Sequence, residues 1–136
     1  MHTRQSSPPR PLPRTVLLGV GTDPQQAALA RAEGADLIDV RAATPAALAA
    51  IRASLPAAVL WAGSPADLVD ADRLAAAAGP DDWDPPAAVI ATAAVCTWLG
   101  APAIRSRHTR AVRRAIDMVA SIAGNRPPSR TTRGLA

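Results

Sequence analysis

The sequence predicts an α/β fold, a parallel sheet of about four strands built from βα units. The main evidence is a repeated helix-start signal, in which a capping residue stands directly before proline at Asp23-Pro24, Thr44-Pro45 and Ser64-Pro65. The capping side chain accepts hydrogen bonds from free N–H groups, and proline fits the first helical turn. A short β-prone run precedes each signal, so three strand–helix units follow one another and their strands are parallel.

The elements of the first half follow from these signals in order. Strands are expected at residues 15–20, 37–40 and 58–61. The helices that alternate with them are expected at residues 24–33, 45–54 and 65–78. Each helix stops near a residue that disfavours its continuation, namely Gly34, Pro56 and Gly79.

The second half contains two helices of different character. Residues 79–86 are rich in Asp and Pro and are expected to form a surface loop. The helix at 87–99 is apolar nearly all round, so it must be buried on more than one side, either within the chain or between chains. A short strand at 101–105 leads to a helix at 109–123, whose apolar residues recur on one face.

The length of 136 residues fits one domain. Residues 1–14 and 126–136 are rich in Pro, Ser, Thr and Arg, and we expect both to be disordered basic tails that flank a single domain at 15–125. Three of the 15 arginines lie in each tail, which leaves the domain nine arginines against eleven acids. The domain has no basic face and no Phe or Tyr, so nucleic acid is not an expected partner.

Cysteine and histidine are too few for a metal centre. Cys96 is the only cysteine, and besides His2 in the first tail the chain has only His108. We expect no metal, no cofactor and no internal disulfide, and we interpret Cys96 as a small core residue. The longest apolar run, residues 87–99, is shorter than the ~20 residues that span a bilayer, and no signal peptide is recognisable. We therefore expect a cytoplasmic protein that is not bound to a membrane.

The run Gly34-Ala35-Asp36-Leu37-Ile38-Asp39-Val40 is the most informative motif. It resembles the G-A-D-I-I-D-V segment of the dihydropteroate synthase family, folate-pathway TIM barrels that join a pterin pyrophosphate to p-aminobenzoate. The resemblance implies a partial TIM-barrel-like fold, because a complete barrel needs about 200 residues or more. Ligands bind at the carboxyl ends of parallel strands, so Asp39 is a candidate ligand contact. In the alternative interpretation, Asp39 caps nearby amides or pairs with Arg41.

The catalytic loops of the family are replaced. Residues 41–45 read Arg-Ala-Ala-Thr-Pro where the family has G-G-E-S-T-R-P, and residues 19–24 stand in place of the loop N-x-T-P-D-S-F. The chain contains no lysine, although a lysine of the pterin pocket belongs to the family's active-site set. The resemblance therefore implies a degenerate protein, and we assign no catalytic residue.

A second resemblance lies near the C-terminus. Residues 100–119 are similar to the family's last strand and helix, which have the pattern G-A-x-I-x-R-x-H-D-V. Arg105 falls on the arginine that contacts the substrate's anionic group. Either Arg107 or, with a shift of one residue, His108 falls on the histidine. Independently of the family, arginines crowd the start of this helix, where positive charge is unfavourable unless an anion binds.

Together these arguments predict one site for an anionic ligand. The predicted ligand-binding residues are Asp39, Arg105, Arg107, His108 and Thr109, whose hydroxyl stands at the helix start. In the alternative interpretation the later arginines form a solvated face, in which Arg113 pairs with Asp117 one turn further on.

Three hypotheses for the function remain open from the sequence. The leading one is a degenerate, non-catalytic dihydropteroate synthase-like protein of the folate pathway, which binds a pterin or phosphorylated ligand or acts as the partner of a full-length enzyme. The second is an active dihydropteroate synthase assembled as a homodimer, and the third is a structural or interaction protein that keeps only the scaffold. A short sheet with two open edges favours a homodimer or a covering partner.

Overall fold

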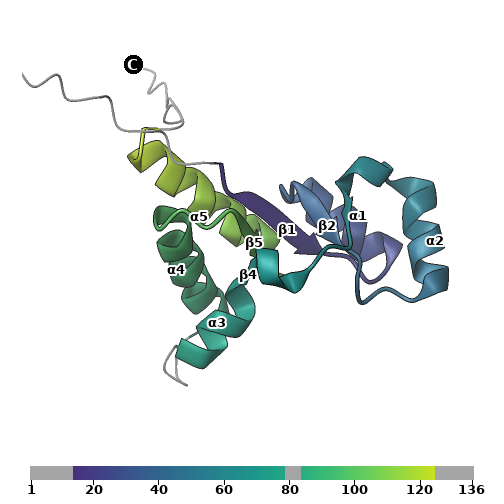
Figure 1. Ribbon diagram of the computed structural model, residues 1–136, viewed down its shortest axis with the longest axis horizontal. Coiled ribbons are helices and arrows are strands. Elements are labelled where there is room, and N and C mark those ends of the chain that lie inside the picture. The colour runs from purple at the N-terminus through teal and green to yellow at the C-terminus, as the bar shows by residue number, and fades with distance from the viewer. Residues whose placement is uncertain (1–13, 79–83, 125–136) are drawn as a thin grey trace, which may run out of the picture.

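The computed structural model describes residues 14–78 and 84–124. Five parallel strands form one sheet in the order β3-β2-β1-β5-β4, with β1 at its centre (Figure 1). The strands are β1 (Val16–Val20), β2 (Leu37–Asp39), β3 (Leu60–Trp61), β4 (Val69–Asp70) and β5 (Ala103–Arg105). The predicted α/β class with a parallel sheet is confirmed, and the sheet has one strand more than expected.

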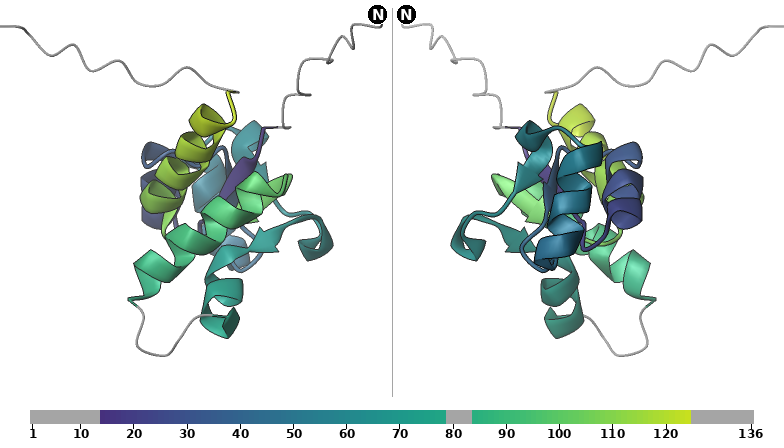
Figure 2. Two further views of the ribbon diagram at one scale, coloured as in Figure 1. Left: turned by 90° about the vertical axis from the view of Figure 1, so that its left-hand side faces the viewer. Right: turned by 90° about the vertical axis from the view of Figure 1, so that its right-hand side faces the viewer.

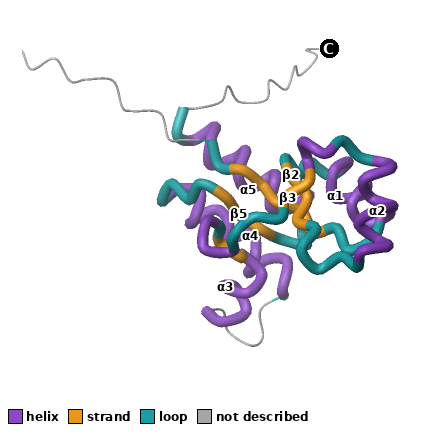
Figure 3. Tube along the Cα trace, turned by 45° about the vertical axis from the view of Figure 1, so that its right-hand side comes forward, coloured by secondary structure: helices purple, strands orange, loops and turns teal. Residues whose placement is uncertain are grey.

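The described residues also form five α-helices, which lie beside the sheet (Figure 3). They are α1 (Pro24–Ala32), α2 (Pro45–Ser54), α3 (Ala71–Ala78), α4 (Pro85–Trp98) and α5 (Thr109–Ile122). Capping sets the start of the first two, because Asp23 accepts a hydrogen bond from Gln26 N at 2.8 Å and Thr44 accepts one from Ala47 N at 3.2 Å. The predicted bounds of these two helices differ from the observed ones by at most one residue.

The prediction of one helix at 65–78 is wrong for the first half of that segment. Ser64 caps only a short 3-10 turn, η2 (Pro65–Asp67), and the chain then extends into β4 before α3 begins. Val69 pairs in parallel with Ile104 of β5, and Asp70 Oδ1 accepts a hydrogen bond from Arg73 N at 3.1 Å, which caps α3. A strand of two residues has no detectable periodicity, so the sequence pattern did not reveal it.

All five helices cover the same face of the sheet. Leu17 and Ile104 are fully buried against residues of α3, α4 and α5, whereas Ile38 is fully buried against residues of α1 and α2. Gly19 pairs with Ile38, and side chains two apart along a strand share a face, so both clusters lie on one side. In Figure 1, α3, α4 and α5 lie to the left of β1, and α1 and α2 lie to its right. The two groups of helices thus follow one another along the same face of the sheet. A single helical layer is the arrangement on the outside of a TIM barrel.

The strand order corresponds to a barrel that is open at one place. In a TIM barrel each strand pairs with the next, and the last pairs with the first. Here β1 pairs with β2, β2 with β3 and β4 with β5, and the last strand β5 pairs with the first strand β1. The edges of the sheet are therefore β3 and β4. The fold is consistent with a partial TIM barrel, and two open edges were expected.

Several expectations fall outside the described residues. These are residues 1–13 of the first tail, the whole second tail (126–136) and the first five residues (79–83) of the loop at 79–86. Arg14, which we assigned to the first tail, pairs with Asp36 at 3.0 Å. Within the described chain α4 packs on α3 and α5 along one side and leaves its other side exposed, so burial of that side between chains stays a prediction.

Candidate functional site

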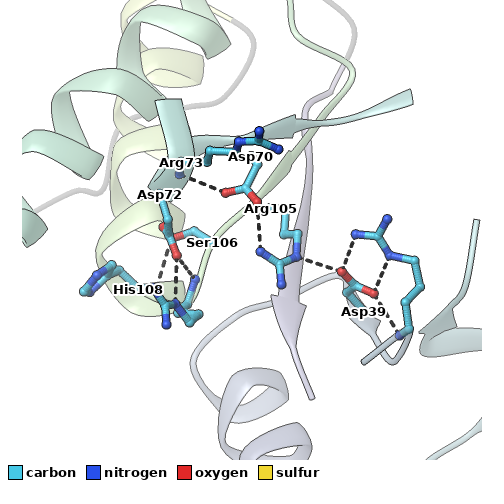
Figure 4. A network of polar contacts seen from close by, with 9 residues as sticks. Asp39, Asp70, Asp72, Arg73, Arg105, Ser106 and His108 are labelled. Atoms are coloured by element: carbon cyan, nitrogen blue, oxygen red, sulfur yellow. Dashed lines mark hydrogen bonds and ion pairs between the residues drawn. The ribbon is translucent and has the colours of Figure 1, made fainter. Parts of the chain in front are cut away.

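An ion-pair cluster occupies the carboxyl ends of three strands (Figure 4). Asp39 ends β2, Arg105 ends β5 and Asp70 ends β4. Neighbours along a strand point to opposite faces, so these side chains lie on the face opposite Ile38 and Ile104, away from the helices. In a barrel this face lines the interior, and ligands bind at its carboxyl end. The cluster is therefore the candidate site.

Arg105 bridges the two carboxylates of this cluster. Its Nε donates to Asp39 Oδ2 at 2.7 Å, and its Nη1 donates to Asp70 Oδ2 at 3.0 Å. Because β1 lies between β2 and β5, the Arg105 side chain connects strands on both sides of the central one. The structure thus brings together two residues of the predicted site, Asp39 and Arg105.

Asp39 is buried, with 3% of its side chain exposed, and its acceptor positions are filled. Besides Arg105, Arg41 donates to it three times, from the backbone N at 3.0 Å, from Nε at 2.9 Å and from Nη2 at 2.8 Å. Burial by itself raises the pKa of Asp39, but the hydrogen bonds from Arg41 and Arg105 outweigh it and hold the pKa below its ordinary value. A carboxylate accepts about four hydrogen bonds, so Asp39 has no free position for a ligand while Arg41 stays in place.

Arg41 extends the cluster toward β3. Its guanidinium carbon lies 4.7 Å from the ring centre of Trp61, within the range of a cation–π contact. Hydrogen bonding to Asp39 raises the pKa of Arg41, so the group stays charged. The alternative interpretation of Asp39, pairing with Arg41, is confirmed, and the contact with Arg105 is present as well.

The remaining predicted residues form a second group at the start of α5. Ser106, which is fully buried, donates to Asp72 Oδ1 at 2.6 Å and accepts a hydrogen bond from His108 N at 3.0 Å. Arg107 donates to Asp72 Oδ2 from its backbone N at 2.9 Å and from Nε at 3.3 Å. Asp72 belongs to the first turn of α3, so this group joins the starts of two helices.

Thr109 and His108 differ in their surroundings. Thr109 is buried and begins α5, and its hydroxyl oxygen lies 3.3 Å from the position that a Cβ on Gly19 would take. The hydroxyl is therefore directed at β1. His108 is half-buried at the N-cap of α5, and its side chain makes no capping hydrogen bond.

Carboxylates of the chain neutralise the arginines on which the predicted anion site was based. Arg105 pairs with Asp39 and Asp70, and Arg107 pairs with Asp72. Further along α5, Arg110 lies 3.7 Å from Glu33, and Arg113 pairs with both Asp36 and Asp117. The expected pairing of Arg113 with Asp117 is confirmed.

The sequence analysis did not predict the roles of Asp70 and Asp72, nor the contact between Trp61 and Arg41. Both acids fall inside the segment expected as one helix (65–78), and the sequence analysis gave them no role. Their only sequence signal was their place at the start of an Ala-rich helix, where Asp is favoured as a cap and in the first turn.

The residues that the structure describes contain neither a candidate metal site nor a candidate membrane span. In that part of the chain no group of three or more His, Cys, Asp or Glu residues could hold a metal ion. Among the described helices, none is long and apolar enough to cross a membrane. Cys96 is half-buried against the core, and burial raises the pKa of its thiol.

The fold and the site define a class of protein, an open parallel α/β scaffold with an internally neutralised ion-pair cluster at the carboxyl ends of its strands. Over 47 residues, 35% of its length, the chain is 49% identical to the inactive dihydropteroate synthase 2 of Mycobacterium tuberculosis (strain H37Rv), and it matches the protein of the same name from Mycobacterium bovis equally well. The match spans 15% of the relative's length. No family model and no solved structure matches the chain. The similarity supports a dihydropteroate synthase-like relationship.

Proposed function

We propose that this chain is a non-catalytic dihydropteroate synthase-like protein that binds a pterin or a phosphate-bearing small molecule at the carboxyl end of its sheet. The observation that carries the proposal is the Arg105 guanidinium, which lies between Asp39 and Asp70 and is 20% exposed. Parallel α/β folds bind ligands at this end of the sheet. A planar guanidinium is suited to carboxylate and phosphate groups.

The absence of catalysis is supported by the state of Asp39. Four hydrogen bonds occupy its carboxylate, so it cannot accept a proton or orient a substrate without displacing Arg41. Departure of a pyrophosphate requires positioned donors and positive charge around the leaving group. Here the two arginines of the cluster are neutralised by Asp39 and Asp70, and the chain has no lysine.

Asp70 is the partner of Arg105 that a ligand would replace. Its side chain is 32% exposed, whereas that of Asp39 is nearly inaccessible. Exchange of Asp70 for a ligand oxygen leaves the contact between Arg105 and Asp39 intact. The bound anion and the Asp70 carboxylate therefore compete for the Arg105 guanidinium. Substitution of Arg105 should weaken anion binding, whereas substitution of Asp70 should strengthen it.

Isothermal titration with pyrophosphate, p-aminobenzoate and a pterin tests this proposal. Arg105→Gln should weaken binding of the anion tenfold or more, since a charge-assisted hydrogen bond contributes roughly 1.5–3 kcal/mol. Asp70→Asn should tighten binding several-fold, and because asparagine also caps helices, α3 keeps its start. Arg52→Gln, a substitution of an exposed arginine on α2, is the matched control and should leave the affinity unchanged.

Two results would contradict the proposed ligand site. One is equal affinity of the wild type, Arg105→Gln and Arg52→Gln for every ligand that binds. The other is a failure of both the wild type and Asp70→Asn to bind any of the three compounds at millimolar concentration.

A second candidate function, an interaction protein that works as a homodimer or beside a folate-pathway enzyme, is favoured by a different observation. The outward side of α4 is apolar and exposed, and the sheet has two open edges. Exposed apolar helix faces and unpaired edges are typical of association surfaces. The active homodimeric transferase receives no such support, because Asp39 and Arg105 are both engaged within one chain.

A further inference from the structure

Two carboxylates of one short segment hold the arginines of the predicted anion site (Figure 4). Asp70 ends β4 and pairs with Arg105 at 3.0 Å. Asp72, in the first turn of α3, accepts hydrogen bonds from the backbone N of Arg107 at 2.9 Å and from its Nε at 3.3 Å. Two acids that are two residues apart thus contact two arginines that are also two residues apart.

The donors around Asp72 are of the kind that binds the oxygens of a phosphate group. Besides the two donors of Arg107, the hydroxyl of the fully buried Ser106 donates to Asp72 Oδ1 at 2.6 Å. Hydroxyls, backbone N–H groups and guanidinium groups are the usual protein donors to phosphate oxygens. The Asp72 carboxylate therefore occupies a position suited to an anionic group of a ligand, as the Asp70 carboxylate does at Arg105.

The rest of this segment is attached by small apolar side chains. β4 is an edge strand, and its two residues pair with β5. In α3 only Ala71 and Ala75 are buried, Val69 of β4 is partly buried, and Leu74 is exposed. Residues 62–66 before β4 are exposed, and α3 projects from the lower end of the molecule in both views of Figure 2. Segments with few buried apolar contacts open at a lower free energy than the core.

We propose that residues 69–78, the β4–α3 segment, are an autoinhibitory element that closes the anion site from within the chain. In the closed state Asp70 and Asp72 take the place of a ligand's anionic groups at Arg105 and Arg107. A ligand binds the open state, in which the segment has left β5 as a unit. The apparent affinity for the ligand is therefore reduced by the fraction of molecules that are open.

This closure rests on the proposed anion binding, whereas detachment of the segment occurs in the free protein and needs no ligand. β4 runs directly into α3, so the Asp70 and Asp72 contacts belong to one short stretch of backbone. Weakening either contact should therefore open both. The two parts of the proposal, detachment and competition with an anion, are measured separately.

Hydrogen exchange of single amides in the ligand-free full chain, followed by nuclear magnetic resonance, tests the detachment. The Arg107 amide donates to Asp72 and exchanges with water when that contact opens. Asp70→Asn alters a different contact, and asparagine still caps α3. It should speed exchange of the Arg107 amide about tenfold, because a neutral hydrogen bond to Arg105 is weaker than a charged one. The Asp36 amide, which donates to a carbonyl of β1 at 2.9 Å, should exchange as in the wild type.

Isothermal titration with pyrophosphate tests the competition. Asp72→Asn should tighten binding several-fold, although the Asp72 carboxylate does not contact Arg105, because the open state becomes more populated. Asp70→Asn should tighten it as well. Asp84→Asn is the matched control, since Asp84 is exposed before α4 and makes no capping hydrogen bond. It should bind pyrophosphate like the wild type.

Far-UV circular dichroism and thermal melts show whether the variants fold. Equal exchange of the Arg107 amide in the wild type and folded Asp70→Asn would overturn the proposal, because the two contacts would then open independently. An affinity that rises in Asp70→Asn but not in Asp72→Asn would also overturn it, while leaving the ligand site at Arg105 in place. Faster exchange without pyrophosphate binding by any variant would contradict the proposed ligand site, and autoinhibition would fall with it.

Discussion

Asp39 and Arg105 illustrate how a buried charge is retained at the end of a parallel sheet. Asp39 is held by Arg41 from its own loop and by Arg105 from two strands away. A buried ion pair adds little net stability, but removal of one partner leaves the other charge unpaired in a poorly solvated place. The bridge implies that Arg105→Gln lowers stability as well as anion affinity.

The lowered pKa of Asp39 predicts a pH-dependent contribution to stability. A carboxyl whose folded pKa is below its unfolded value of about 4 stabilises the fold at higher pH. This contribution is complete above the unfolded pKa and is lost as the pH falls through the folded one. Urea unfolding between pH 3 and 7 should therefore show a fall in stability toward acid pH that is smaller in Asp39→Asn.

The same substitution should also destabilise the protein at neutral pH, by less than the roughly 3–5 kcal/mol of a fully buried pair, because the side chains of Arg41 and Arg105 are 30% and 20% exposed and can be hydrated. Asp23→Asn removes one carboxyl but keeps a helix cap, so it is the control. If the stability of Asp39→Asn falls toward acid pH as steeply as that of the wild type, Asp39 does not supply this pH dependence.

At the scale of elements, β1 and α1 approach each other closely because of Gly19. A Cβ at this position would lie 2.7 Å from the Ala30 Cβ and 3.0 Å from the Ala35 Cβ. The small residues of α1 thus pack directly on the backbone of the central strand. This close packing positions the carboxyl end of β1 beside the site.

Gly19→Ala should destabilise the protein by about 1–3 kcal/mol, the usual cost of overpacking a core. Ala30→Gly removes the nearest obstructing methyl group, so the double variant should lose less stability than the sum of the two single losses. Equilibrium unfolding in urea measures all three variants. Additive losses would show that the two positions do not share the contact.

Element bounds could be predicted where a capping signal was followed by a full helix. α1 and α2 were placed within one residue because Asp23 and Thr44 make the expected caps. The same signal at Ser64 starts only η2, because β4 pairs with β5 and extends the chain before α3. Tertiary pairing outweighed local propensity in that segment.

At the scale of the whole molecule, the pairing of β5 with β1 keeps the closing contact of a barrel, and the gap falls between β3 and β4. The residues of the site come from both sides of this contact, Asp39 from β2 and Arg105 from β5. An open barrel therefore still holds the two predicted site residues together. It also lets the Asp70 carboxylate of an edge strand enter the cluster.

We expect the purified full chain to form no dihydropteroate from the pterin pyrophosphate and p-aminobenzoate. The reason is that Asp39 has no free acceptor position, the chain has no lysine, and Arg105 can contact a leaving group only by giving up Asp70. A chromatographic product assay, with a full-length dihydropteroate synthase as positive control, measures this. Turnover by the wild type that disappears in Arg105→Gln would favour the active transferase.

The sequence by itself determined the α/β class, the parallel direction of the strands, most helix bounds and the nearness of Asp39 and Arg105 to one end of the sheet. Those properties follow from capping residues, periodicity and the rule that parallel strands share their carboxyl ends. Only the tertiary structure decided what surrounds Arg105. Asp70 lies 35 residues away in sequence and reaches the guanidinium because β4 pairs with β5, a nonlocal contact of two residues that leaves no periodic trace. Ion pairs form between any opposite charges that packing brings together. The neutralisation of Arg105 by Asp70 could therefore not be predicted before the strand pairing was known.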